Sequence, residues 1–318
     1  VYASDFELGK LLNNKNLNKT SLSVSVHLEK PTYGKIKGVA EGDIPNFDFK
    51  GYSYKDITLD VAYDGLQVDG VLNVDDENGK LAVNGLFDLS DKEQPILNFT
   101  ARALNIQLDK LNLAEKLKYS YLSFVINADF KGKDIDNAEG KIKIDSLDFI
   151  REDKSFMMKE FLLELSGVEK ERNIKIESDI INGEINGIYS FSTMVAAMQE
   201  TLHPYLPAII KENTRNTEDK TNILAFDFQI NNTENLSAIF KLPVTVISPA
   251  KIIGSYNNIL NRFNLEAYTP VIKAGGMNIK SGYVRITNPS DSINADINAF
   301  VVGQKEAITD ISIRAHIK

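Results

Sequence analysis

The chain has 318 residues, 43% of them hydrophobic and 25% charged, so it can bury a sizeable core and is not expected to be disordered. Its net charge of -8, without a run rich in Lys or Arg, argues against a nucleic-acid partner, because a duplex binder needs a basic face. It has no cysteine, which excludes disulfides, thiolate metal ligands and cysteine nucleophiles, and no apolar run long enough for a membrane-spanning helix.

Apolar and polar residues alternate in the first half of the chain, which is typical of strands with one dry and one wet face. Asp64-Gly65 is a strong hairpin turn signal, and the sequence Asp76-Glu77-Asn78-Gly79 turns the chain again. We therefore predict consecutive antiparallel strands over residues 57–89. Their apolar side chains should share one face: Ile57, Leu59, Val61, Leu66, Val68, Leu72, Val74, Leu81, Val83 and Phe87.

The same alternation recurs further along the chain, with Lys, Asp, Asn, Ser and Thr at most of the intervening positions. It marks strands near residues 142–144, 174–180, 293–301 and 311–317. Two further rows contain aromatic residues, which fit either a closed core or a lining for acyl chains. These rows include Leu122, Phe124, Ile126 and Phe130 in the first, and Phe226 and Phe228 in the second.

Two segments have helical spacing instead. Asp109 could cap a short helix through Leu117, and Ser192 could cap a longer one that Pro204 and Pro207 should kink or end. The apolar side of that second helix would contain Val195, Met198, Leu202, Leu206 and Ile209. Residues 249–269 fit a helix or a hairpin, and the Asn257-Asn258 pair favours the hairpin.

No change in composition marks a domain boundary, so the helix and the polar loop after it are the best candidate for an interruption. We expect a first run of strands over 1–191, an insertion over 192–222 and a second run over 223–318, all in one continuous fragment of a longer protein. A dozen or more strands with one apolar face each cannot be covered by two short helices. The sheet must pack on itself, close as a barrel, or leave an apolar groove.

The sequence contains no motif that is typical of a catalytic or metal-binding site. His27, His203 and His316 are far apart and lack ligand spacing, and no nucleotide-binding or hydrolase motif is present. The acidic stretch 75–79 lacks the full spacing of a calcium loop and is better explained as a solvated turn. We therefore expect no enzyme activity, no metal site and no cofactor.

Several short segments within residues 1–130 resemble sequences of the large TamB-type, AsmA-like proteins of Bacteroidetes. The clearest are the run GYSYKDI at 51–57, the strand and turn LNVDDENG at 72–79, and LNIQLDKLNL at 104–113. After about residue 150 the similarity lies more in the alternation of apolar and polar residues than in particular segments. The segments KIIGSYNN at 251–258 and TPVIKAGG at 269–276 are nevertheless similar to segments of the family.

The resemblance implies an elongated, curved antiparallel sheet that forms a taco-like trough with an apolar interior. It also implies a periplasmic segment of a protein anchored in the inner membrane, which moves phospholipid towards the outer membrane and supports outer-membrane biogenesis. The apolar residues named above would then line a groove for phospholipid acyl chains. The alternative is an assembly scaffold that pairs its strands with an Omp85-type barrel (TamA- or BamA-like) or with nascent outer-membrane proteins.

Overall fold

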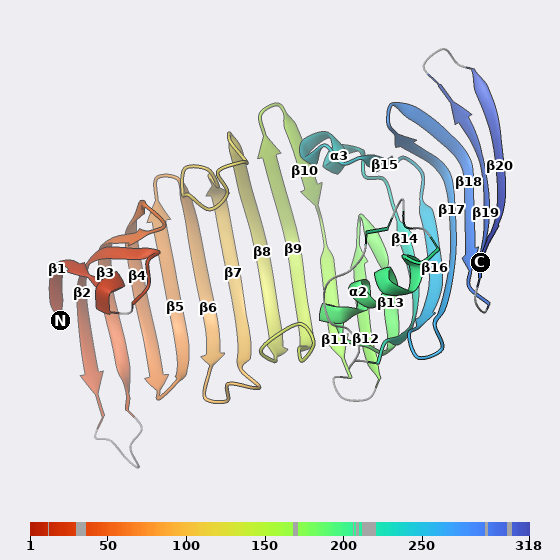
Figure 1. The fold of residues 1–318 in the computed structure, drawn as a ribbon. Coiled ribbons are helices and arrows are strands. Elements are labelled where there is room, and N and C mark those ends of the chain that lie inside the picture. The colour runs from red at the N-terminus through yellow and green to blue at the C-terminus, as the bar shows by residue number, and fades with distance from the viewer. Residues whose placement is uncertain are drawn as a thin grey trace. The chain divides into compact units, whose positions relative to one another are not determined.

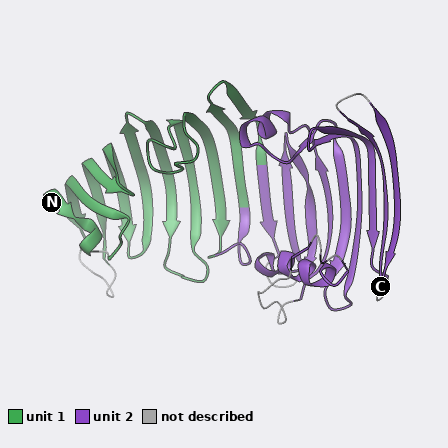
Figure 2. Cartoon of the chain, turned by 45° about the horizontal axis from the view of Figure 1, so that its top comes forward, with its two compact units in different colours: residues 1–133, 141–161 green, residues 134–140, 162–318 purple. Residues whose placement is uncertain are grey.

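The computed structural model describes the whole chain except residues 12, 30–35, 168–170, 206, 208–209, 212–220, 290–291 and 304–306. The described residues form twenty β-strands and three short helices, which confirms the predicted mainly β fold class. The chain divides into two compact units (Figure 2). Unit 1 contains residues 1–133 and 141–161, and unit 2 contains residues 134–140 and 162–318.

Unit 1 is an antiparallel series of strands joined mainly by hairpins (Figure 1). Among the described pairings β1 bonds to β2, and its other side is an open edge. The elements of this unit are β1 (Tyr2–Glu7), α1 (Leu8–Leu11), β2 (Leu17–Leu28), β3 (Lys37–Phe49), β4 (Tyr52–Asp64), β5 (Gln67–Asp76), β6 (Gly79–Asp88), β7 (Ile96–Ile106), β8 (Ser120–Lys131), β9 (Glu139–Arg151) and β10 (Lys154–Met158).

The register of β4, β5 and β6 confirms the predicted consecutive strands over 57–89. Asp64 pairs with Gln67, which leaves Gly65 and Leu66 as the two turn residues, and Gly65 has the positive φ of 66° that such a turn requires. Leu59 pairs with Leu72, which in turn pairs with Val83, so these side chains share one face. The placement of Leu66 on that face was wrong, because a residue in the turn is no longer part of the strand alternation.

Unit 2 is also antiparallel, and β20 at its end is paired with β19. The predicted hairpin over 249–269 is confirmed, since β16 pairs with β17 from Lys251–Tyr268 to Asn257–Arg262. The elements of this unit are β11 (Phe161–Ser166), β12 (Arg172–Ser178), β13 (Ile181–Ile188), α2 (Phe191–Leu202), β14 (Ile223–Ile230), α3 (Glu234–Phe240), β15 (Val244–Val246), β16 (Ala250–Asn257), β17 (Arg262–Ala274), β18 (Met277–Thr287), β19 (Ile293–Val302) and β20 (Ile308–Ile317).

The helix predicted over 109–117 is absent, and turns take its place. Leu111 N donates to Gln107 O and Leu113 N to Leu108 O, but Asn112 between them has a positive φ that ends any helix. Tertiary packing explains the difference, because Leu111 is buried against Tyr52 and Tyr54. The segment's apolar residues therefore serve a local cluster, whereas a helix would present them on one stripe.

Helix α2 confirms the second predicted helix, with two corrections. Its N-cap is Ser190, two residues earlier than expected, and Val195 points to solvent with 57% exposure. The helix ends at Leu202, two residues before Pro204, as the missing amide hydrogen and fixed φ of proline require. Leu206 and Ile209 lie outside the described residues. Helices α1 and α3 are short and were not predicted.

Candidate functional site

Unit 1 has one continuous apolar face across seven strands, β2 to β8. Residues directly opposite each other in an antiparallel pair point to the same side of the sheet, so the register defines the face. One row across all seven strands reads Val24, Gly42, Leu59, Leu72, Val83, Ala101 and Ile126. A second row, from β3 to β8, reads Gly38, Tyr63, Val68, Phe87, Leu97 and Phe130.

The opposite face of the same strands is mostly polar. Its central row, from β2 to β8, reads Ser25, Glu41, Asp60, Val71, Asn84, Thr100 and Asn127. Cross-strand hydrogen bonds between exposed side chains occur on this face, such as Thr100 Oγ1 to Asn127 Oδ1 at 2.8 Å. The sheet of unit 1 therefore has a wet side and a dry side.

The middle of the dry side remains partly exposed. Val68 and Leu72 keep 37% and 36% of their surface accessible, and their apolar neighbours are only half-buried. One end is closed, where Leu111 from the segment after β7 packs in a cluster with Tyr52, Tyr54 and Ala103. Within unit 1, most of the contacts found between described elements join neighbouring strands of the sheet. Large exposed apolar patches mark interaction or ligand sites.

Fifteen of the sixteen residues predicted to line a groove lie on an apolar face, in two separate groups. On the face of unit 1 are Ile57, Leu59, Val61, Val68, Leu72, Val74, Leu81, Val83, Phe87, Leu122, Phe124, Ile126 and Phe130. Phe226 and Phe228 belong to unit 2, and Leu66 is the turn residue already described. The prediction missed the contributions of β2, β3 and β7, although the alternation of Leu97, Phe99 and Ala101 was present in the sequence.

Unit 2 has an apolar face of the same kind. One row across β13, β14 and β16 to β20 reads Gly183, Phe228, Ile252, Ala267, Val284, Ile297 and Ile313. This row borders a recess of about 520 Å³, within the size range of small-molecule pockets. The recess is lined mainly by aliphatic side chains, among them Ile230, Val246, Ala250, Ile272, Ile279 and Ala299.

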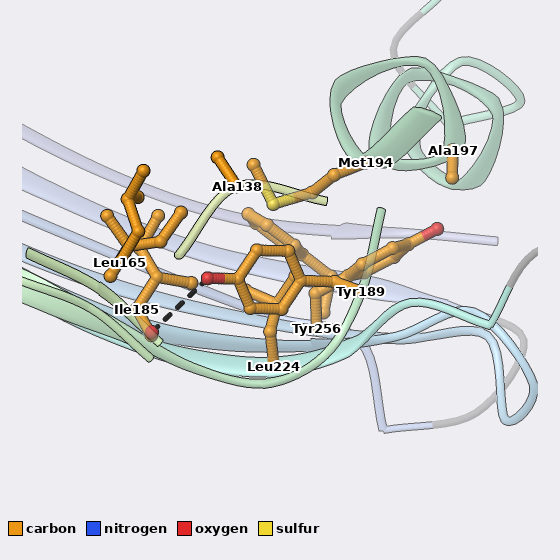
Figure 3. Close-up of a cluster of buried hydrophobic side chains, with 10 residues drawn as sticks. Ala138, Leu165, Ile185, Tyr189, Met194, Ala197, Leu224 and Tyr256 are labelled. Atoms are coloured by element: carbon orange, nitrogen blue, oxygen red, sulfur yellow. Dashed lines mark hydrogen bonds between the residues drawn. The ribbon is translucent and has the colours of Figure 1, made fainter. Parts of the chain in front are cut away.

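One end of the face of unit 2 is covered by α2 (Figure 3). Met194 and Ala197 point from the helix towards the sheet, where Leu224 and Tyr256 are 4% and 2% exposed. Tyr256 Oη lies 2.9 Å from Thr201 Oγ1 on the helix, and burial raises the pKa of this phenol. Unlike the middle of unit 1, this end is a closed core.

One buried carboxylate of unit 1 has several structural partners. Asp76 is buried at the turn between β5 and β6, and its carboxylate accepts hydrogen bonds from Tyr52 Oη at 2.6 Å, Lys55 N at 2.9 Å and Asn78 N at 2.9 Å. Burial, together with the hydrogen bond to Asp76, raises the pKa of Tyr52 to about 12. The acidic turn is therefore a clamp between β4 and the β5–β6 hairpin, and its buried carboxylate is not simply solvated.

The three histidines lie on separate elements. His27 is on β2, His203 follows α2, and His316 is on β20. In the part of the chain that the structure describes, no group of three or more His, Asp or Glu side chains is placed to hold a metal ion. Within that same part, no helix combines the length and apolar character needed to cross a membrane. The apolar faces are therefore the strongest candidates for function.

Comparison with protein-family models, with curated proteins and with solved structures gives no match for this chain. The family resemblance of residues 1–130 thus remains an expectation from the sequence. Function has to be inferred from what the two apolar faces can do physically. They can remove hydrocarbon from water without breaking a bond, which requires no nucleophile, acid or base.

Proposed function

We propose that the apolar faces bind the acyl chains of phospholipids, and that the chain is a periplasmic segment of a TamB-type, AsmA-like protein that carries phospholipid between the inner and outer membranes. The observation that carries the proposal is the face of unit 1, which is apolar across seven strands and partly exposed in its middle. The resemblance of residues 1–130 supplies the periplasmic setting and the class of lipid.

The free energy of burying an acyl chain on this face is compatible with movement of the chain along the sheet. Each methylene group removed from water gains about 0.8 kcal/mol, so even a partly covered chain is held. Successive strands present similar rows of Leu, Val and Ala, such as Leu72, Val83 and Ala101. A chain that moves from one strand to the next therefore exchanges like contacts, and no single site traps it. A charged headgroup can stay in water at the margin of the face, because the face itself offers it no partner.

A scaffold function remains the second candidate, and a specific observation favours it. Strand β20 is paired with β19, and Ile308 and Ile313 on it are 70% and 50% exposed. An exposed strand of this kind is a template for β-augmentation by another chain. The partner would then be a strand of an Omp85-type barrel or of a nascent outer-membrane protein.

A matched pair of substitutions on β8 tests the lipid proposal. Ile126 lies on the apolar face and its neighbour Val125 on the opposite face, opposite Arg102. A carboxylate at position 126 would repel hydrocarbon because lipid tails cannot hydrogen-bond to it, whereas one at 125 faces water. We expect Ile126→Glu to fold and to lose most copurified phospholipid, and Val125→Glu to keep it. Native mass spectrometry with lipid extraction measures both.

Three outcomes would count against the proposal. Wild-type protein free of lipid, and unable to take up phosphatidylglycerol from vesicles, would exclude the conduit. Equal lipid content in the two variants would exclude the face of unit 1. Unfolding of Ile126→Glu alone would show that residue 126 belongs to a closed core. If the wild type carries no lipid but pairs with an outer-membrane protein through β20, the scaffold function holds instead.

A further inference from the structure

The rows of the apolar face of unit 2 run without interruption from beneath α2 into the recess. On β14 the row reads Leu224, Phe226, Phe228 and Ile230. Leu224 belongs to the buried cluster under the helix, Phe226 and Phe228 pack against that cluster, and Ile230 lines the recess. The neighbouring row on β16 follows the same course, from Tyr256 under the helix to Ile252 and Ala250 in the recess. The covered surface and the open recess are thus one surface.

Helix α2 is not needed to hold the sheet together. It lies between β13 and β14, and these strands already pair up to Ile188 and Ile223, on either side of the insertion. Ser190 N donates to Asn222 Oδ1 at 3.2 Å, which closes the neck of the insertion where it leaves the sheet. Movement of α2 away from the face would therefore break no strand pair.

A single carboxylate holds the start of α2 in place. Asp136 lies in the connection between β8 and β9, far from the helix in sequence. It accepts hydrogen bonds from Phe191 N, from Ser192 N at 3.3 Å, and from the hydroxyls of Ser190 at 2.9 Å and Ser192 at 2.5 Å. Arg172 Nη1 is 3.4 Å from the same carboxylate. An acceptor with negative charge at a helix N-terminus satisfies free amides and complements the dipole.

We propose that the surface beneath α2 and the recess form one binding site for a single long acyl chain, and that α2 is its displaceable cover, latched by Asp136. This inference rests on the proposed function and adds a site and its control. The path from Leu224 to Ile230 spans six residue steps, about 20 Å at the rise of a strand. One bilayer leaflet provides about 15 Å for a lipid chain, so the path accommodates a full chain.

The side chains with which α2 covers the surface indicate what kind of ligand that surface can bind. Met194, Met198 and Leu202 occupy it with flexible, unbranched or singly branched apolar groups, much as an acyl chain would. Among the described residues that border the recess, Lys251 is the one with a charged side chain, and its ammonium group lies 3.3 Å from Asp227 on the wet side of the sheet. Most of the described side chains that line the path are aliphatic, so a hydrocarbon chain fits it, although the buried hydroxyl of Thr269 in the recess would stay without a hydrogen-bond partner.

The test combines one latch variant with a photoreactive probe. Asp136→Asn keeps the side chain's size and removes its charge, and Asp227→Asn is the control on the wet face of the same unit. Hydrogen exchange measures release of α2, and palmitic acid carrying a diazirine, crosslinked and mapped by peptide mass spectrometry, locates the chain. We expect amides of residues 191–202 to exchange roughly fivefold faster or more in Asp136→Asn, with β14 and β16 unchanged.

We also expect crosslinks at Leu224 and Tyr256 to increase severalfold in Asp136→Asn and to stay at the wild-type level in Asp227→Asn. If α2 is released and these crosslinks do not increase, the site beneath α2 does not exist. If α2 exchange is unchanged, Asp136 is not the latch. In both cases crosslinks on the face of unit 1 would leave the proposed function standing, whereas their absence from both units would refute it as well.

A second variant keeps the test decisive if Asp136→Asn fails to fold. Ser190→Ala with Ser192→Ala removes two hydroxyl donors to the latch and leaves the carboxylate and Arg172 together. It should release α2 in part and give the same new crosslinks at a lower level. New crosslinks confined to residues outside the path from Leu224 to Ile230 would contradict the proposal.

Discussion

Both units are built from antiparallel strands with one apolar face, but this face is covered differently in each of them. In unit 1 the middle of the face is partly exposed, and one end is closed by Leu111 with Tyr52 and Tyr54. In unit 2 a twelve-residue helix covers one end and an open recess follows it. The difference arises in a single connection, because β13 and β14 are joined by a long insertion that folds back on the sheet, whereas β4 and β5 are joined by a two-residue turn.

This comparison separates two uses of apolar side chains. A leucine beneath α2 is enclosed on all sides, and it stabilises the unit. A leucine in the middle of unit 1, such as Leu72, keeps 36% of its surface exposed. Stability is therefore expected to fall more on truncation of a leucine beneath α2 than on truncation of one in the middle of unit 1.

The largest expected effect comes from truncation of one leucine in each unit. Leu224→Ala removes a side chain that is 4% exposed and should lower the free energy of unfolding by about 3 kcal/mol. Leu72→Ala removes one that is 36% exposed and should cost about 1 kcal/mol. Urea denaturation monitored by hydrogen exchange of each unit measures both. Equal costs would mean that the face of unit 1 is covered in solution.

The next largest effect is expected on stability at high pH, where the hydrogen bond between Tyr52 and Asp76 in the clamp of unit 1 is lost. The folded pKa of Tyr52 is about 12 and its ordinary value is 10.0, so the phenol adds stability below pH 10 that is lost as the pH rises towards 12. Tyr52→Phe removes the hydrogen bond to Asp76 and should cost about 1 to 2 kcal/mol at neutral pH. Between pH 10 and 12, the free energy of unfolding should change less in Tyr52→Phe than in the wild type. An equal change in both proteins would show that Tyr52 does not contribute to stability in this way.

A smaller effect is expected for the latch at low pH. Burial alone would raise the pKa of Asp136, but hydrogen bonds from Ser192, Ser190 and the helix amides lower it below its ordinary value of 3.8. A lowered pKa adds stability above pH 3.8 that is lost as the pH falls through the folded value. Exchange of α2, corrected for intrinsic rates, should rise on acidification in the wild type and much less in Asp136→Asn. Equal pH dependence in the two proteins would count against the latch.

The smallest effect should come from the wet face. Lys251 and Asp227 form an ion pair at 3.3 Å, but both side chains are more than half exposed. Such pairs contribute about 0 to 1 kcal/mol, so Lys251→Gln should leave unfolding within about 0.5 kcal/mol of the wild type and leave lipid content unchanged. A large loss in either measurement would show that the polar face has a role beyond solubility.

The sequence by itself determined many of the strands, several of their turns and the apolar side of those strands. Period-two alternation is a local property, and the two-residue turn at Gly65 fixes which residues pair across it, so Leu59, Leu72 and Val83 could be placed on one face. A helix in this region and its disturbance by proline were also predicted, because proline acts locally on its own backbone, but the sequence left open whether Pro204 kinks or ends the helix and placed the cap at Ser192 instead of Ser190.

Only the tertiary structure decided which apolar side chains are enclosed and which stay open. Leu111 was expected in a helix and lies in a turn, because its burial against Tyr52 and Tyr54 outweighs local propensity. Phe226 and Phe228 looked like the aromatic residues of unit 1, yet they pack against the cluster beneath α2. The latch joins Asp136 to Phe191 across more than fifty residues, and no local pattern encodes a contact of that range. Burial depends on which segments meet in space, and alternation along one strand cannot specify this.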